Sequence, residues 1–150
     1  MKANPEMQPY YDIWFGLQHL YDRWAKRYGL TAHAMFVLYC IAKGEGRCTQ
    51  KQICEQLMLP KQTVHTILNG FERKGWLVRQ VMELDKRNKH LMLTAAGEEY
   101  ADAALGELAK REEAATHRMH PQQFRAMLES SLQFFENLSQ TMKADESSQE

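Results

Sequence analysis

Two helix patterns and two strand patterns follow one another between Thr49 and Gly97, and this order constrains the fold more than any other feature. Thr49 and Gln52 have the spacing of a capping box, which predicts a short helix that begins there. After Pro60, which suits a first helical turn, apolar residues recur at helical spacing and predict a second helix with one buried face. Its buried positions are Val64, Ile67, Leu68 and Phe71. The segment therefore contains two helices joined by a short turn.

A β-hairpin is predicted after this pair of helices. Gly75 ends the second helix, and aromatic and β-branched residues then predict a strand over residues 76–82. A polar loop over residues 83–89 leads into a second strand at residues 90–93, and Arg47 and Cys48 are expected to add a short third strand. Two helices followed by a hairpin outline a winged helix-turn-helix. We therefore predict a mainly α fold with a small β-hairpin wing and additional dimerisation helices.

Two short motifs mark the hairpin, Asp85-x-Arg87 and Leu93-Thr94-x-x-Gly97. Together they closely resemble the wing signature of the MarR family of bacterial transcriptional regulators, and the resemblance extends over nearly the whole chain. It implies a protein, usually a repressor, that binds double-stranded DNA as a homodimer. Independently of the family, Arg87 at a hairpin tip can enter a minor groove while Asp85 holds its guanidinium. Thr94 is expected to cap the helix that follows.

The residues expected to contact DNA lie on the second helix and on the wing. Base-edge candidates are Gln62, Thr63, His65 and Asn69, phosphate candidates are Lys61, Arg73, Lys86 and Lys89, and Thr66 shares the helix face. MarR proteins often have an arginine near the middle of this helix, where this chain has Thr66. The net charge of the chain is zero, but residues 43–94 hold ten Lys and Arg against five Asp and Glu. We expect DNA to lie against this positive segment, on a near-palindromic operator.

Helices outside the winged helix carry apolar stripes. The first helix places aromatic and leucine residues at alternating steps of four and three: Tyr10, Trp14, Leu17, Tyr21, Trp24 and Tyr28. Thr31 caps a second helix over residues 32–43, which is apolar nearly all round and should be buried. After Gly97 an alanine-rich helix should run to about Arg118. A last amphipathic helix begins after Pro121.

These stripes predict a dimer, because three apolar helices are too few to close a core of their own. In the MarR family the equivalent helices interdigitate with those of a second subunit. We therefore divide the chain into a winged helix-turn-helix at residues 31–94, a helical dimerisation region at residues 1–30 and 95–143, and a disordered tail at residues 144–150.

A small effector is expected where the dimerisation helices meet the winged helix, since this is where effectors commonly settle in the family. Our candidates are Trp14, Leu17, His33 and Phe36. Aromatic walls with one titratable group suit a small aromatic acid or phenol. The alternative is that these side chains simply fill the core.

Cysteine chemistry offers a different signal. Cys40, Cys48 and Cys54 show no CxxC spacing and no signal peptide precedes them, which fits a reducing cytoplasm. We expect Cys40 to be buried and inert. Cys54, expected to be partly exposed in the first helix of the pair, is a candidate for a redox-responsive regulator.

Other functional classes find little support in the sequence. Glu113, His117 and His120 share a helical face at i, i+4 and i+7, but surface side chains at a helix end explain them better than a metal site. No phosphate-binding glycine loop, nucleophile elbow or HExxH motif is present, so we expect neither an enzyme nor a cofactor. No apolar run is long enough for a membrane span. A winged helix used for protein–protein assembly remains the alternative from another class.

Overall fold

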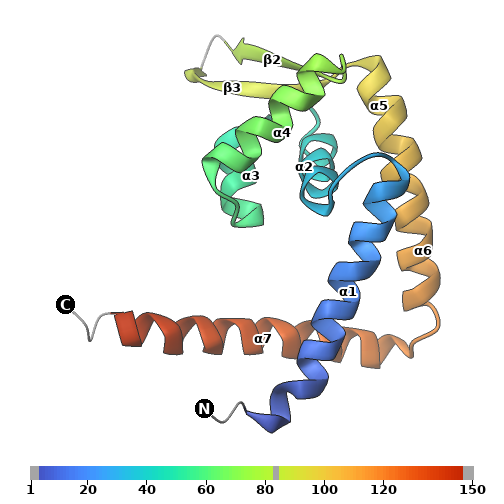
Figure 1. Cartoon of the computed structure of the whole chain (residues 1–150), viewed down its shortest axis with the longest axis vertical. Helices are drawn as coiled ribbons and strands as arrows, with labels where there is room; N and C mark the ends of the chain where they lie inside the picture. The colour runs from blue at the N-terminus through green and yellow to red at the C-terminus, as the bar shows by residue number, and fades with distance from the viewer. Residues whose placement is uncertain (1–3, 83–84, 147–150) are drawn as a thin grey trace. The chain divides into compact units, whose positions relative to one another are not determined.

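The computed structural model describes residues 4–82 and 85–146 of the 150-residue chain, which divides into two compact units, Met1–Leu108 and Ala109–Glu150. Its first elements are the 3₁₀ turn η1 (Pro5–Met7), α1 (Gln8–Arg27), α2 (Ala32–Lys43), β1 (Cys48–Thr49), α3 (Gln50–Leu57) and α4 (Lys61–Arg73) (Figure 1). There follow β2 (Leu77–Met82), β3 (Asp85–Leu93), α5 (Ala95–Ala101), the π-helical segment η2 (Asp102–Gly106), α6 (Glu107–Thr116) and α7 (Pro121–Glu146). The predicted fold class, mainly α with a small antiparallel sheet, is confirmed.

Helix α2 forms the centre of the core of the first unit, as its all-round apolar sequence predicts. Its buried residues are Ala34, Met35, Val37, Leu38, Cys40 and Ile41. The cluster also contains Ile53 of α3, Val64 and Leu68 of α4, and Leu91 of β3, each at most 1% exposed. Within the part of the chain that the structure describes, every buried side chain is nonpolar. Hydrophobic burial around α2 therefore holds the winged helix together.

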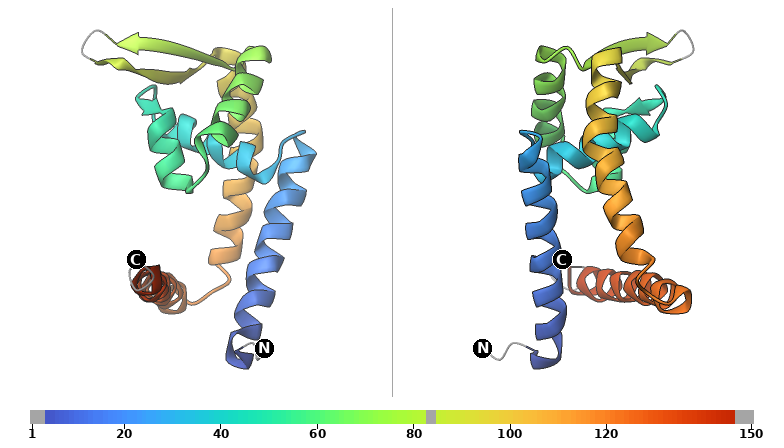
Figure 2. Two further views of the ribbon diagram at one scale, coloured as in Figure 1. Left: turned by 60° about the vertical axis from the view of Figure 1, so that its left-hand side comes forward. Right: turned by 90° about the vertical axis from the view of Figure 1, so that its right-hand side faces the viewer.

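The sheet has the strand order β1-β3-β2, with both pairs antiparallel. Cys48 pairs with Leu91, so the predicted third strand is present, but it comprises Cys48–Thr49 and does not include Arg47. Leu77 pairs with Leu93 at the base of the hairpin. The β2–β3 hairpin projects past α3 and α4 (Figure 2). It therefore has the form of a wing beside the helix pair.

Strand β3 is longer than predicted. It begins at Asp85, so residues 85–89, predicted as loop, belong to the strand. Val81 pairs with Lys89 and Met82 with Asp85, with a shift of register between the two pairs. Val81, Asn88 and Lys89 are exposed, so this part of the hairpin does not require an apolar alternation. Sequence alternation therefore missed this part of the strand.

The helix after the wing contains a π-helical segment that was not predicted, Asp102–Gly106 between α5 and α6. In a π-helical turn the backbone leaves its usual i to i+4 hydrogen bonds. The indole N–H of Trp24 donates to the carbonyl oxygen of Ala104 within this segment, at 3.1 Å. The segment thus ties the helix after the wing to α1. Helix α6 then ends at Thr116, two residues before the predicted end.

The last helix, α7, extends to Glu146, so the prediction of disorder from residue 144 is wrong for residues 144–146. The polar residues there continue a helix that is already formed, where each added residue gains one backbone hydrogen bond. Residues 147–150 lie outside the described part of the chain. Over the described residues, no helix is both long and apolar enough to cross a membrane.

The base of the wing is held against the start of α5. Thr94 caps α5 as predicted, since its hydroxyl accepts from the backbone N–H of Gly97 at 3.1 Å. The same hydroxyl donates to the carbonyl oxygen of Gly75 at 2.6 Å. A Cβ at Gly97 would collide with the backbone of Trp76. Only glycine therefore allows the wing and α5 to approach this closely.

We predict that Gly97→Ala destabilises the fold by about 1 to 3 kcal/mol, because the added methyl must push the Trp76 backbone away. Gly70→Ala is the matched control, since Gly70 also lies inside a helix and has open space around its Cβ position. That change should stabilise by about 0.5 to 1 kcal/mol through helix propensity. Urea unfolding of both variants would measure these changes in stability. Equal free energies of unfolding in the two variants would contradict the close approach of Gly97 to the Trp76 backbone.

Candidate functional site

The turn between α3 and α4 is fixed by local hydrogen bonds. The capping box is present: the Thr49 backbone N–H donates to Gln52 Oε1 at 2.9 Å, and the Gln52 N–H donates to Thr49 Oγ1 at 3.3 Å. Met58 ends α3 in the left-handed conformation at φ 52°, which is uncommon for a residue with a side chain. The Gln50 amide donates to the carbonyl oxygen of Lys61 at 3.2 Å and joins the starts of the two helices. The helix pair is therefore positioned as a unit.

Helix α4 presents the predicted DNA-contacting face. Its buried residues are Val64, Leu68 and Phe71. On the other side Lys61, Gln62, Thr66 and Arg73 are exposed, and Thr63, His65 and Asn69 are half-buried. The Thr66 hydroxyl donates back to the carbonyl oxygen of Gln62 at 3.0 Å. This face is therefore accessible to a partner over most of its length.

A polar latch joins α4 to the wing, and sequence reasoning missed its central residue, Arg79 of β2. The Arg79 guanidinium donates to Asn69 Oδ1 at 2.7 Å and lies 3.3 Å from Glu72 Oε1. The Arg79 side chain is only 18% exposed, so these contacts hold it in place. Asn69, a predicted base-edge residue, thus has its carbonyl oxygen committed to the wing and keeps its amide N–H groups as donors. The one sequence signal was an arginine in an otherwise apolar strand start.

The wing residues divide into two groups. Asp85, Lys86 and Arg87 lie in the backbone of β3, not in the turn, so the expectation that Arg87 sits at the hairpin tip is corrected. The side chains of these three residues lie outside the described part of the structure. Lys89 is exposed further along the strand. Strand pairing continues to Met82 and Asp85, and residues 83–84 lie outside the described part of the chain.

A cavity of about 820 Å³ opens between α1, the start of α2 and the α3–α4 turn. All four predicted effector residues line it: Trp14, Leu17, His33 and Phe36. Tyr21 adds an aromatic ring, with its centroid 5.3 Å from that of Phe36. The structure therefore brings together residues that are up to 22 positions apart. Leu57, Met58 and Leu59 of the turn also line the cavity, and sequence reasoning missed them.

Comparison with known proteins identifies the winged helix. A model of the MarR family matches residues 28–88, from the end of α1 to the middle of β3. This segment, which contains the helix pair and most of the wing, is similar to the MarR family.

Individual relatives agree with the family match. The HTH-type transcriptional regulator SarZ of Staphylococcus epidermidis is 32% identical over 79 residues, which cover 53% of this chain and 53% of SarZ. The match thus spans about half the length of the curated relatives. The matched proteins are transcriptional regulators and not enzymes.

Solved structures show the same fold. A MarR family regulator from Neisseria meningitidis is 24% identical, with a TM-score of 0.81, over 95% of this chain and 99% of that protein. Staphylococcus aureus MepR in complex with DNA is 20% identical, with a TM-score of 0.73, over 91% and 99%. The expected MarR-type winged helix is confirmed at the level of the fold.

The cysteines of this MarR-type winged helix occupy two environments. Cys40 and Cys48 are buried, and Cys54 on α3 is half-buried. Burial raises the pKa of the Cys40 thiol, with an opposing effect from Lys43. Burial and the neighbouring Cys40 raise the pKa of Cys48 to about 11. Cys40 is thus buried as predicted, and of the three thiols Cys54 is the most accessible to reagents.

The alternative metal site depended on a helix that continues past His120. Helix α6 ends at Thr116, so Glu113, His117 and His120 do not share one helical face. Instead, His120 precedes α7, where its Nδ1 accepts from the backbone N–H of Gln122 at 3.3 Å. Among the described residues, no three His, Cys, Asp or Glu side chains lie together where they could hold a metal ion.

Removal of the Arg79 latch should loosen the wing from α4. We predict that Arg79→Met lowers the free energy of unfolding by about 1 to 3 kcal/mol, because it leaves Asn69 and Glu72 without their partner. A double-mutant cycle with Asn69→Ala, measured by urea unfolding, would isolate the pair. Strictly additive effects of the two changes would show that the hydrogen bond contributes nothing to stability.

Proposed function

We propose that the protein is a homodimeric transcriptional repressor that binds a near-palindromic operator and releases it when a small aromatic acid or phenol binds. The observation that carries the DNA-binding part is the exposed face of α4 beside a cationic wing. The MarR family match over residues 28–88 and the likeness to MepR, whose structure was solved with DNA, support it. In this proposal α4 enters a major groove, and Arg87 reaches the adjacent minor groove.

Two apolar surfaces support the homodimer. The first unit exposes Ile13, Phe15 and Leu20 on α1, each at least 61% accessible. The second unit exposes apolar residues of α7: Met127, Leu128, Leu132, Phe135, Leu138 and Met142. Patches of this kind mark interaction sites in soluble proteins. A two-fold partner would cover both surfaces and set two copies of α4 about one DNA turn apart.

The cavity beside the α3–α4 turn supports the effector. Its aromatic walls supply apolar contact area, and His33 supplies a group that can donate to an oxygen. The cavity reaches Met58, which ends α3 immediately before α4. A ligand in this cavity can change DNA binding only if its affinity differs between the DNA-bound and the DNA-free arrangements of α4.

Operator binding tests the DNA-binding proposal, with sites selected from random duplex DNA. Arg87→Ala should weaken binding to the selected operator by about 1 to 3 kcal/mol. Lys89→Ala, which removes a phosphate contact, should weaken binding to all sequences and flatten the salt dependence by about one unit. Arg118→Ala, a change outside the winged helix, is the control. Selected sites without two-fold symmetry, or one monomer per site, would contradict the homodimer model.

The effector proposal is tested by titrating the protein–operator complex with benzoate and phenol, and with cyclohexanecarboxylate as the non-aromatic control. The aromatic compounds should release DNA from the parent protein. His33→Ala should raise the concentration needed by about tenfold, the equivalent of about 1.4 kcal/mol. Tyr39→Ala, on the same helix but outside the cavity, should respond like the parent. Release that is equal in the parent and in His33→Ala would exclude this cavity.

A further inference from the structure

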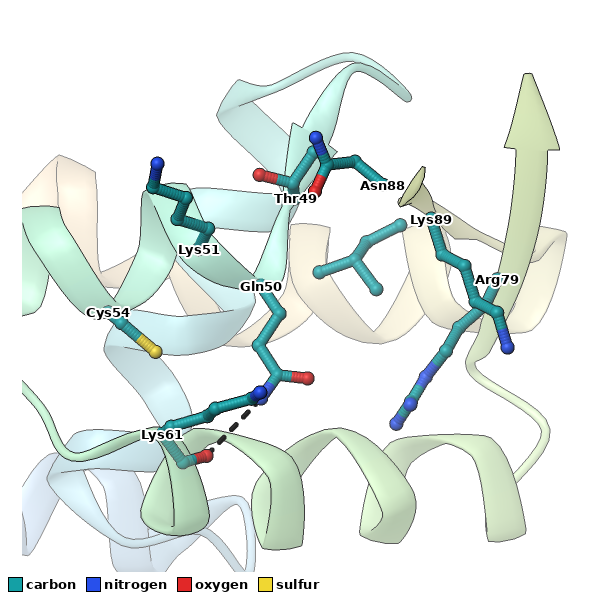
Figure 3. Close-up of a pocket in the computed structure, with 9 residues that line it drawn as sticks. Thr49, Gln50, Lys51, Cys54, Lys61, Arg79, Asn88 and Lys89 are labelled. Atoms are coloured by element: carbon teal, nitrogen blue, oxygen red, sulfur yellow. Dashed lines mark hydrogen bonds between the residues drawn. The ribbon is translucent and has the colours of Figure 1, made fainter. Parts of the chain in front are cut away.

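A second hollow, of about 480 Å³, lies between the wing and the starts of α3 and α4 (Figure 3). Four cationic side chains line it, from four different elements: Lys51 of α3, Lys61 of α4, Arg79 of β2 and Lys89 of β3. The remaining lining residues are uncharged, and none is a carboxylate. A concave surface with one sign of charge concentrates the electric field and attracts counter-ions. We call this hollow the basic cleft.

The cations of the basic cleft are not equally free to move. Arg79 is held by Asn69 and by the Glu72 carboxylate 3.3 Å away, which fixes the position of its charge and partly offsets that charge. Lys51 lies 3.8 Å from Glu55, which partly offsets its charge. Lys61 and Lys89 are exposed and lie in the lining on either side of the hollow (Figure 3). An anion could therefore recruit these two flexible ammonium groups beside a stationary guanidinium.

The start of α4 adds to the positive potential. Lys61 is the first residue of this 13-residue helix, and Pro60 before it provides no side-chain cap. The first N–H groups of a helix have no partner within the helix and carry a partial positive charge. An uncapped helix start thus adjoins the converging cations. The two features are independent, and both favour an anion with several acceptor oxygens.

We propose that the basic cleft is a binding site for a phosphoryl group. The oxygens of a phosphoryl group, three in a terminal phosphate and two in a DNA phosphodiester, can accept hydrogen bonds from several donors at once, and their negative charge favours a site with several cations. The group comes either from the DNA backbone, where the strand passes between α4 and the wing, or from a free phosphate compound. Occupation by a free compound competes with DNA. The DNA source rests on the proposed function, whereas the anion site itself does not.

Cys54 provides a reporter for this site, because it lies on the wall of the basic cleft (Figure 3). Its thiol is half-buried, and the other two cysteines are fully buried in the core. A ligand in the basic cleft should therefore shield Cys54 from a small reagent without changing the reactivity of the others. Iodoacetamide is suitable because it is uncharged, so its approach does not depend on the ionic atmosphere.

The experiment measures the alkylation rate of Cys54 in the full-length protein, with peptide mass spectrometry to locate the label. Saturating pyrophosphate should slow the reaction several-fold relative to chloride at the same ionic strength. Lys61→Gln and Lys89→Gln should each lose most of this protection, and Lys89→Arg should retain it. Lys74→Gln is the matched control, since Lys74 follows the last residue of α4 and does not line the basic cleft. Equal rates in pyrophosphate and chloride for the parent protein would overturn a site for free phosphate.

A second arm distinguishes the two sources by using operator duplex in place of pyrophosphate. If operator DNA protects Cys54, one backbone phosphate is replaced by a neutral methylphosphonate. Loss of the protection on this replacement would assign the site to the DNA strand. Protection by pyrophosphate alone would assign it to a free compound, and it would stand even if the protein bound no operator. Protection by neither probe, with the fold intact, would refute the proposal.

Discussion

Helix α2 imposes the main constraint on this fold, because a helix that is apolar on nearly every side is stable only when other elements surround it. Met35, Val37 and Leu38 are fully buried, and α3, α4 and β3 each contribute side chains to the same cluster. The winged helix is therefore the covering that α2 requires. Since α2 occupies the centre, the polar face of α4 must point outward. The exposed face that suits DNA is thus a consequence of the core.

Elements that depend on local hydrogen bonds could be predicted from the sequence to within a residue. Thr31, Thr49 and Thr94 each accept from a backbone N–H three residues later, and each marks the helix start that its motif predicts. The start of β3 and the π-helical segment could not be predicted. The start of β3 depends on its pairing with β2 across the hairpin, and the π-helical segment lies against Trp24, 80 residues earlier in the sequence.

In the candidate site, too, some residues could be predicted from the sequence and others could not. Trp14, Leu17, His33 and Phe36 could be named because their helix faces were visible in the apolar pattern and the family resemblance supplied the location. The contribution of the α3–α4 turn could not be named, since it arises from the packing of the turn against α1. Arg79 likewise stands out in the sequence only as a cation in an apolar strand start, which does not identify its partners. Its role follows from the approach of β2 to Asn69 and Glu72, which only the tertiary structure brings about.

The π-helical segment between α5 and α6 has a consequence for insertions and deletions. Such a segment is equivalent to one extra residue within an α-helix, accommodated by a wider turn. Removal of one residue from Asp102–Gly106 would let the backbone return to regular α-helix. Residues after the deletion would then keep their directions around the helix axis, because the wider turn had absorbed the extra residue. A single-codon deletion here would leave the same side chains of α6 facing a partner, whereas the same deletion within α6 would rotate every later residue by about 100°.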